Sequence, residues 1–96
     1  MPTEHLTEYI LYARTVRFRF AQSARRHRIG QAHALAAMAA AGEPVLTFDE
    51  GPQLHWVGLD DLGIELHIAG RPAIEDPDDL VIIVHVQPTS QRRPPL

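Results

Sequence analysis

Cysteine and lysine are both absent from this 96-residue chain, and each absence restricts the available chemistry. Without cysteine there is no disulfide framework, thiolate zinc site or cysteine nucleophile. All nine basic residues are arginine. Long hydrophobic runs are also missing, since the longest stretch of large aliphatic residues runs only from Leu80 to Val84. That stretch is too short for a membrane-spanning helix or for the apolar part of a signal peptide. We therefore expect a cytoplasmic protein that does not contact a membrane.

The residues that are present fit a single small domain. Hydrophobic residues make up 45% of the chain, which is ordinary for a globular protein and too high for a disordered one. A chain of this length has no room for two cores. We expect a leader at residues 1–15, one α+β domain at residues 16–90 and a flexible tail at residues 91–96.

The formal net charge is only −3, but the charges are segregated along the chain. Residues 1–41 carry six arginines and two acids, whereas residues 42–79 carry ten acids and one arginine. Such segregation can create one anion-attracting face on an acidic protein. The alternative is that these charges only keep surface loops solvated.

The first half of the chain predicts one strand and two helices. Val16 to Phe20 alternates apolar residues with arginine, as a half-buried strand does. Gln22 to Arg28 is expected to form a short basic helix capped by Ser23. Gln31 to Ala41 is rich in alanine and predicts the stronger helix, which Gly42 ends.

The second half predicts four strands, at residues 45–48, 53–58, 64–69 and 80–86. A three-residue loop ending at Gly63 joins the middle two as a hairpin and pairs Val57 with His67 and Trp56 with Ile68. This register puts the apolar side chains on one face, because a one-residue slip would mix the two faces. The other face then carries His55, Val57, Glu65 and His67.

These elements predict an α+β fold in which two helices pack on one face of a mostly antiparallel sheet. The order is strand, helix, helix and then four strands, and the other face of the sheet is left partly open. The expected core consists of Phe18, Phe20, Leu35, Met38, Trp56, Leu66, Ile82 and Val84.

Four motifs, in this order, resemble the BrnT and RelE group of small bacterial toxins. They are the basic turn Ala24–Ile29, the helix exit Gly42–Pro44, the glycine hairpin Trp56–Leu66 and the apolar strand Leu80–Val86, which closes on Pro88–Arg93. Together they extend from Val16 to Arg93. The resemblance implies a RelE/BrnT-like fold, endoribonuclease activity, RNA as substrate and an antitoxin protein as partner, with a homodimer or a toxin–antitoxin hetero-oligomer as the assembly.

Several residues have the chemistry that metal-independent RNA cleavage needs. The reaction requires a base for the 2′-hydroxyl proton, an acid for the leaving 5′-oxygen and a cation near the phosphate. Histidine can take either proton role near neutral pH. We expect His67 and His85 to divide these roles on the open sheet face, with Glu65 holding one imidazole and Arg92 meeting the phosphate. No cofactor and no metal are expected.

A basic run on the predicted first helix is the candidate RNA-binding surface, since phosphate contacts dominate affinity for nucleic acids. The expected RNA-binding residues are Arg25, Arg26, His27 and Arg28, extended by Arg17 and Arg19 on the first strand and by Arg93 in the tail. The alternative is a solvated helix face whose charges pair with the acidic loop at residues 76–79.

Two other interpretations stay open. The acidic balance and the missing lysines favour a non-enzymatic protein-interaction module of the same fold. His55, His67 and Glu65 are acceptable zinc ligands by type, although their spacing matches no known motif. Trp56 can serve as a base-stacking platform, but its apolar neighbours on the same face favour the core.

Overall fold

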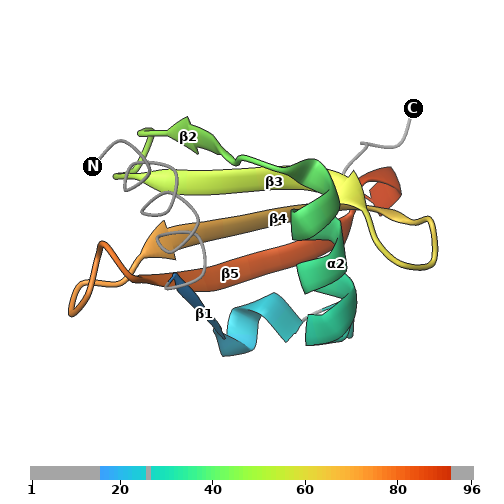
Figure 1. Ribbon diagram of the computed structural model, residues 1–96, viewed down its shortest axis with the longest axis horizontal. Helices are drawn as coiled ribbons and strands as arrows, with labels where there is room; N and C mark the ends of the chain where they lie inside the picture. The colour runs from blue at the N-terminus through green and yellow to red at the C-terminus, as the bar shows by residue number, and fades with distance from the viewer. Residues whose placement is uncertain (1–15, 26, 92–96) are drawn as a thin grey trace, which may run out of the picture.

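The computed structural model describes residues 16–25 and 27–91 of the chain, which form one sheet covered on one face by a helix (Figure 1). The strands are β1 (Arg17–Phe20), β2 (Val45–Thr47), β3 (Gln53–Leu59), β4 (Glu65–Pro72) and β5 (Leu80–Pro88). They lie in the order β1-β5-β4-β3-β2. The helix is α2 (Gln31–Ala41), and single 3-10 turns form η1 (Gln22–Arg25) and η2 (Thr89–Gln91). Within these residues no helix is long and apolar enough to cross a membrane.

The predicted fold class is wrong, because the described residues contain one α-helix and a five-stranded mixed sheet. β1 pairs with β5 in parallel, and the other three pairings are antiparallel. The expected first helix stops at Arg25 after one 3-10 turn. Ser23 does not cap a helix there, since its hydroxyl donates to the Val84 carbonyl of β5. Arg28 has a φ of 59°, a left-handed conformation that is incompatible with continuing a helix.

The predicted hairpin register between β3 and β4 is confirmed. Val57 pairs with His67 and Trp56 with Ile68. Gly63 has a φ of 79°, a conformation that glycine adopts without steric cost. Asp60 closes the turn, because its carboxylate accepts the backbone N–H groups of Leu62 and Ile64. The register is therefore held by local chemistry at the turn and by the burial of one face.

The core lies between α2 and the sheet, and its helix side consists of small residues. Ala34, Ala37 and Met38 are buried, whereas Leu35, which was expected in the core, is 41% exposed. The reason is close packing of α2 on β3 at Gly58. A Cβ at Gly58 would lie 2.4 Å from the Ala37 carbonyl oxygen. Alanine on this face of the helix lets the two backbones approach, and the larger Leu35 is turned away.

The other expected core residues give a mixed result. Trp56 is buried at 5% exposure and Leu66 is also buried, while Phe20 is half-buried against the same cluster. Phe18 is 36% exposed, but its ring meets that of Trp56 edge-on. The expected burial of Ile82 and Val84 on β5 is wrong, since the side chains packed in the core are those of Val81, Ile83 and Val86.

A β-bulge explains the error on β5. The pairing of β4 with β5 shifts between Ala69 and Gly70, so that Ala69 pairs with His85 and Gly70 pairs with Ile83. Val84 is the extra residue, and alternation restarts on either side of it. Ile83 packs over Gly70, where a Cβ would lie 3.0 Å from its Cδ1 atom. Strict period-two alternation therefore fails at this point of β5.

The start of α2 is tied to the β3–β4 turn by an ion pair between His33 Nδ1 and Asp61 Oδ1. The hydrogen bond to Asp61 is the largest cause that raises the pKa of His33, and the same bond lowers the pKa of Asp61. His33 therefore contributes stability below its ordinary value of 6.5, and this contribution is lost as pH rises through the raised pKa. Asp61 contributes above its ordinary value of 3.8, and that contribution is lost as pH falls through the lowered pKa.

We expect the melting temperature of wild type to exceed that of His33→Asn by the largest margin between the ordinary values of 3.8 and 6.5. The margin should shrink as pH rises toward about 8, because His33 then loses its charge. Both side chains are partly exposed, so the effect is small and screened by salt. Thermal unfolding of both proteins across this pH range measures it, and a margin independent of pH would contradict the assignment.

Candidate functional site

Four histidines form a row across the sheet face opposite α2. His55 comes from β3, His67 from β4, His85 from β5, and His27 follows η1. Successive ring centres are 5.2 Å apart for His55 and His67, 5.3 Å for His67 and His85, and 6.2 Å for His85 and His27. All four residues are half-buried. We call these four residues the histidine row.

Strand pairing places three of these histidines on the same face. Directly opposite residues of antiparallel strands point the same way, and Ala69 pairs with both His55 and His85. His67 lies two residues from Ala69 along β4, which returns it to that face. The bulge at Val84 also contributes, because it restores His85 to the open face after Ile83 has faced the core.

The rings of His55 and His67 meet edge to edge. Nδ1 of His55 lies 3.0 Å from Nε2 of His67, and the rings are within 5° of parallel. Rings stacked face to face cannot bring these nitrogens so close without overlap of their carbon atoms. The 5.2 Å between ring centres is accounted for by the 3.0 Å nitrogen–nitrogen distance and the two ring radii. The pair is therefore a nearly linear, in-plane N–H···N hydrogen bond.

This geometry bears on the alternative of a zinc site at His55, His67 and Glu65. The lone-pair directions of the two nitrogens point at each other across 3.0 Å, so a metal 2.0–2.1 Å from both nitrogens would lie off both of these directions. The Glu65 carboxylate accepts a hydrogen bond from Thr89. The group of described residues with ligand atoms close enough for a metal is instead His33, Asp60 and Asp61, where the Asp60 carboxylate already closes the hairpin turn.

The basic segment after β1 contacts the histidine row through His27. The backbone N–H of Ala21 donates to the Ile83 carbonyl, and the Ser23 hydroxyl donates to the Val84 carbonyl at the bulge. These two bonds hold η1 against β5. The ring of His27 consequently lies edge-on to the ring of His85. The basic run and the histidine face, which are far apart in sequence, meet at this point.

The structure brings together two of the four expected catalytic residues. His67 and His85 share the open face with 5.3 Å between ring centres, within the distance needed to flank one phosphate. Two details differ from the expectation. Glu65 is bonded to Thr89 and holds no imidazole. The Nδ1 atom of His67 is buried and its Nε2 atom faces His55. Arg92 is outside the described residues.

The expected RNA-binding residues divide into three groups. Arg25 and Arg28 are exposed, and their guanidinium groups form no hydrogen bond or ion pair with another described residue. Arg17 pairs with Asp76 and Arg19 with Glu75, both in the loop between β4 and β5, which contains the expected acidic loop and is called the acidic loop from here on. The acidic loop thus neutralises β1, and the two arginines do not extend a basic patch. Arg26 and Arg93 lie outside the described residues, and Trp56 is buried in the core and cannot stack on a base.

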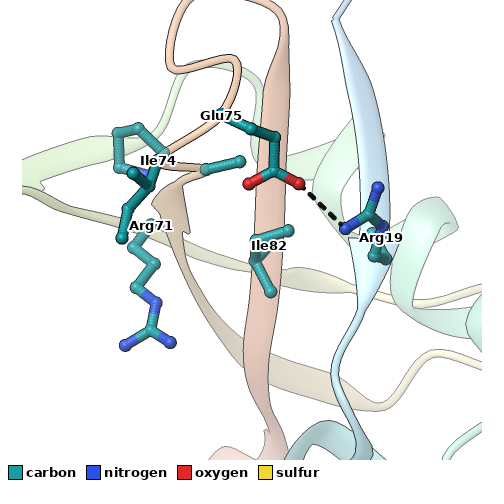
Figure 2. Close-up of a pocket in the computed structure, with 7 residues that line it drawn as sticks. Arg19, Arg71, Ile74, Glu75 and Ile82 are labelled. Atoms are coloured by element: carbon teal, nitrogen blue, oxygen red, sulfur yellow. Dashed lines mark hydrogen bonds and ion pairs between the residues drawn. The ribbon is translucent and has the colours of Figure 1, made fainter.

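A shallow pocket lies at the other end of the open face, and sequence analysis missed it. It is lined by Arg19, Arg71, Pro72, Ala73, Ile74, Glu75 and Ile82. Figure 2 shows the Arg19–Glu75 ion pair across this pocket, with the Arg71 guanidinium pointing away from it. Side chains of a strand alternate between the two faces of the sheet, so residues 67, 69 and 71 share one face. This alternation predicts Arg71 on the open face, provided that the expected strand at residues 64–69 is extended beyond residue 69. The same rule identifies Thr47, which lies two residues from Val45, the partner of His55.

Comparison with known proteins assigns this chain to no family. No protein-family model, no curated protein and no solved structure matches this chain. The resemblance to the BrnT and RelE toxins therefore stays a prediction, and the function rests on the chemistry of the described residues.

Proposed function

We propose that this protein binds RNA at residues 25–28 and cleaves it without a metal at the adjoining end of the histidine row. The observation that carries this proposal is the contact between His27 and His85, with ring centres 6.2 Å apart. His27 follows Arg25 by two residues and directly precedes Arg28, and both arginines are exposed. This reaction needs cationic side chains that bind the phosphate, together with one general base and one general acid.

The proposed reaction uses one imidazole and one imidazolium. The neutral ring of His27 or His85 removes the proton from the 2′-hydroxyl, and the 2′-oxygen then forms a bond to phosphorus. The bond from phosphorus to the 5′-oxygen breaks, and the protonated ring gives its proton to that oxygen. The products are a 2′,3′-cyclic phosphate and a free 5′-hydroxyl. Arg25 and Arg28 stabilise the charge on the phosphate during this exchange.

The salt dependence of RNA affinity tests the proposed binding surface at residues 25–28. Replacing Arg25, Arg26 and Arg28 together with glutamine is expected to weaken RNA binding for every RNA sequence alike. It should also flatten the dependence of affinity on salt, because each lost phosphate contact releases about one counterion fewer. Titration of labelled single-stranded RNA at several salt concentrations measures the slope.

The matched control is the double variant Arg17→Gln and Arg19→Gln. Both arginines are ion-paired to the acidic loop, so their removal should leave the slope unchanged. If the triple variant keeps the wild-type slope, residues 25–28 are only a solvated surface and the proposed RNA-binding role of these residues is wrong.

A second candidate, the protein-interaction module, is favoured by the β2 edge of the sheet. Among the strands that the structure describes, β2 pairs only with β3, and the apolar residues Val45, Leu46 and Phe48 at this edge are exposed. An apolar edge strand with unpaired backbone groups is suited to adding a strand from another chain. This candidate predicts that the folded protein does not cleave RNA. The toxin role and an antitoxin partner rest on the resemblance alone, and growth arrest on induced expression tests them.

A further inference from the structure

Thr47 continues the histidine row toward the β2 edge. Its Oγ1 atom lies 3.1 Å from Nε2 of His55, and Nδ1 of His55 lies 3.0 Å from Nε2 of His67. These two bonds link β2, β3 and β4 through side chains alone. All three residues are half-buried, which strengthens such bonds relative to those in open water.

We propose that Thr47 and His55 are positioning residues that hold the ring of His67 and couple its tautomer to that of His55, and that His67 in turn holds the ring of His85. The catalytic part of this inference rests on the proposed function. The hydrogen-bond part concerns the chain itself and holds whether or not RNA is the substrate.

The tautomers of the two histidines are coupled by the geometry. A neutral imidazole has one N–H donor and one bare nitrogen acceptor. If His55 donates from Nε2 to the Thr47 oxygen, its Nδ1 must accept, and His67 must then donate from Nε2. If the Thr47 hydroxyl donates to Nε2 of His55, then Nδ1 of His55 donates and Nε2 of His67 is bare. In both arrangements the two histidines adopt the same tautomer.

His67 passes this constraint on through contact with His85. The two ring centres are 5.3 Å apart and the planes are tilted by 57°. Nε2 of His67 faces His55 and its Nδ1 is buried, so the bond to His55 holds the ring of His67 from one side. A ring held in this way presents a constant surface to its neighbour, and a catalytic ring needs a fixed orientation to transfer a proton efficiently.

Nitrogen-15 NMR of the full-length protein tests the hydrogen bonds directly. In wild type we expect a scalar coupling across the bond between Nδ1 of His55 and Nε2 of His67. We also expect imidazole nitrogen shifts that assign both rings to the same tautomer. Opposite tautomers, or no coupling, would overturn the inference.

Substitution of Thr47 tests the origin of the constraint. Thr47→Val keeps a β-branched side chain but removes the hydroxyl, so the ring of His55 loses one of its two hydrogen bonds and the scalar coupling to His67 should weaken. Thr47→Ser restores the hydroxyl and should restore the coupling. Thr89→Val is the matched control, since it removes a hydroxyl bonded to Glu65 outside the row and should change neither ring. A scalar coupling of wild-type size in Thr47→Val would overturn the role of Thr47.

RNA cleavage supplies the second readout. Thr47→Val should lower kcat by about tenfold and leave KM unchanged, the size expected for losing one orienting hydrogen bond. Coupled tautomers in a wild-type protein that does not cut RNA would contradict the proposed function and support the relay. A wild-type protein that cuts RNA, with kcat unchanged in Thr47→Val, would contradict the positioning role and support the proposed function.

Discussion

Replacing His85 with alanine is expected to lower the rate of RNA cleavage by roughly 10²–10⁴-fold, the usual contribution of a positioned proton-transfer group. The ring of His85 contacts the rings of both His27 and His67. Its loss therefore removes one member of the acid–base pair and separates the basic segment from the rest of the row. Single-turnover cleavage of a labelled RNA measures the effect.

The same substitution should change the free energy of unfolding by less than about 1 kcal/mol, because His85 is half-buried and lies outside the core. His33→Ala is the matched control, since His33 belongs to α2 and pairs with Asp61 outside the row. It should leave the cleavage rate unchanged. Equal rates for wild type and His85→Ala would contradict the proposed chemistry and favour the interaction module.

The largest expected effect on stability comes from Gly58→Ala. The added Cβ would lie 2.4 Å from the Ala37 carbonyl oxygen and 3.0 Å from the Ala41 Cβ. Both neighbours belong to α2, and backbone atoms cannot move aside as a flexible side chain can. The helix must shift away from β3, and overpacking of this kind costs about 1–3 kcal/mol. Chemical denaturation measures the loss.

Gly30→Ala is the matched control for this substitution. A Cβ at Gly30 meets only the His33 ring at 3.5 Å, an ordinary contact distance, and its φ of −65° suits any residue. We expect a change of less than about 1 kcal/mol, which covers the modest preference for glycine over alanine before a helix. If both variants are equally stable, α2 does not pack on Gly58 as closely as described.

Features determined by neighbouring residues could be predicted from the sequence. The β3–β4 register follows from Gly63 at the turn and from the alternation around Trp56, and both signals are local. The end of α2 at Gly42, with a φ of 81°, has the same origin. The shared face of His67 and His85 was also predicted, but from an unbroken alternation on β5, whereas the structure reaches it through the bulge at Val84.

Other features depend on contacts between segments that are distant in the sequence. Hydrophobic alternation and secondary-structure propensity are local properties and do not predict such contacts. The predicted helix at residues 22–28 is a single 3-10 turn because Ser23 and Ala21 bond to β5. Arg17 and Arg19 appeared available for RNA, but the acidic loop at residues 75–76 neutralises them. Pairing with a loop more than fifty residues away leaves no local signal.

The sequence by itself determined the strands after residue 44, the hairpin and the chemistry available on the open face. Only the tertiary structure decided that β1 runs parallel to β5 and that β5 bulges at Val84. It also decided that His27 reaches His85. The physical reason is that turns and alternation are set by residues within a few positions of one another. The bulge, in contrast, depends on which side chain fits over Gly70, and the position of His27 depends on hydrogen bonds to the carbonyls of β5 beside that bulge.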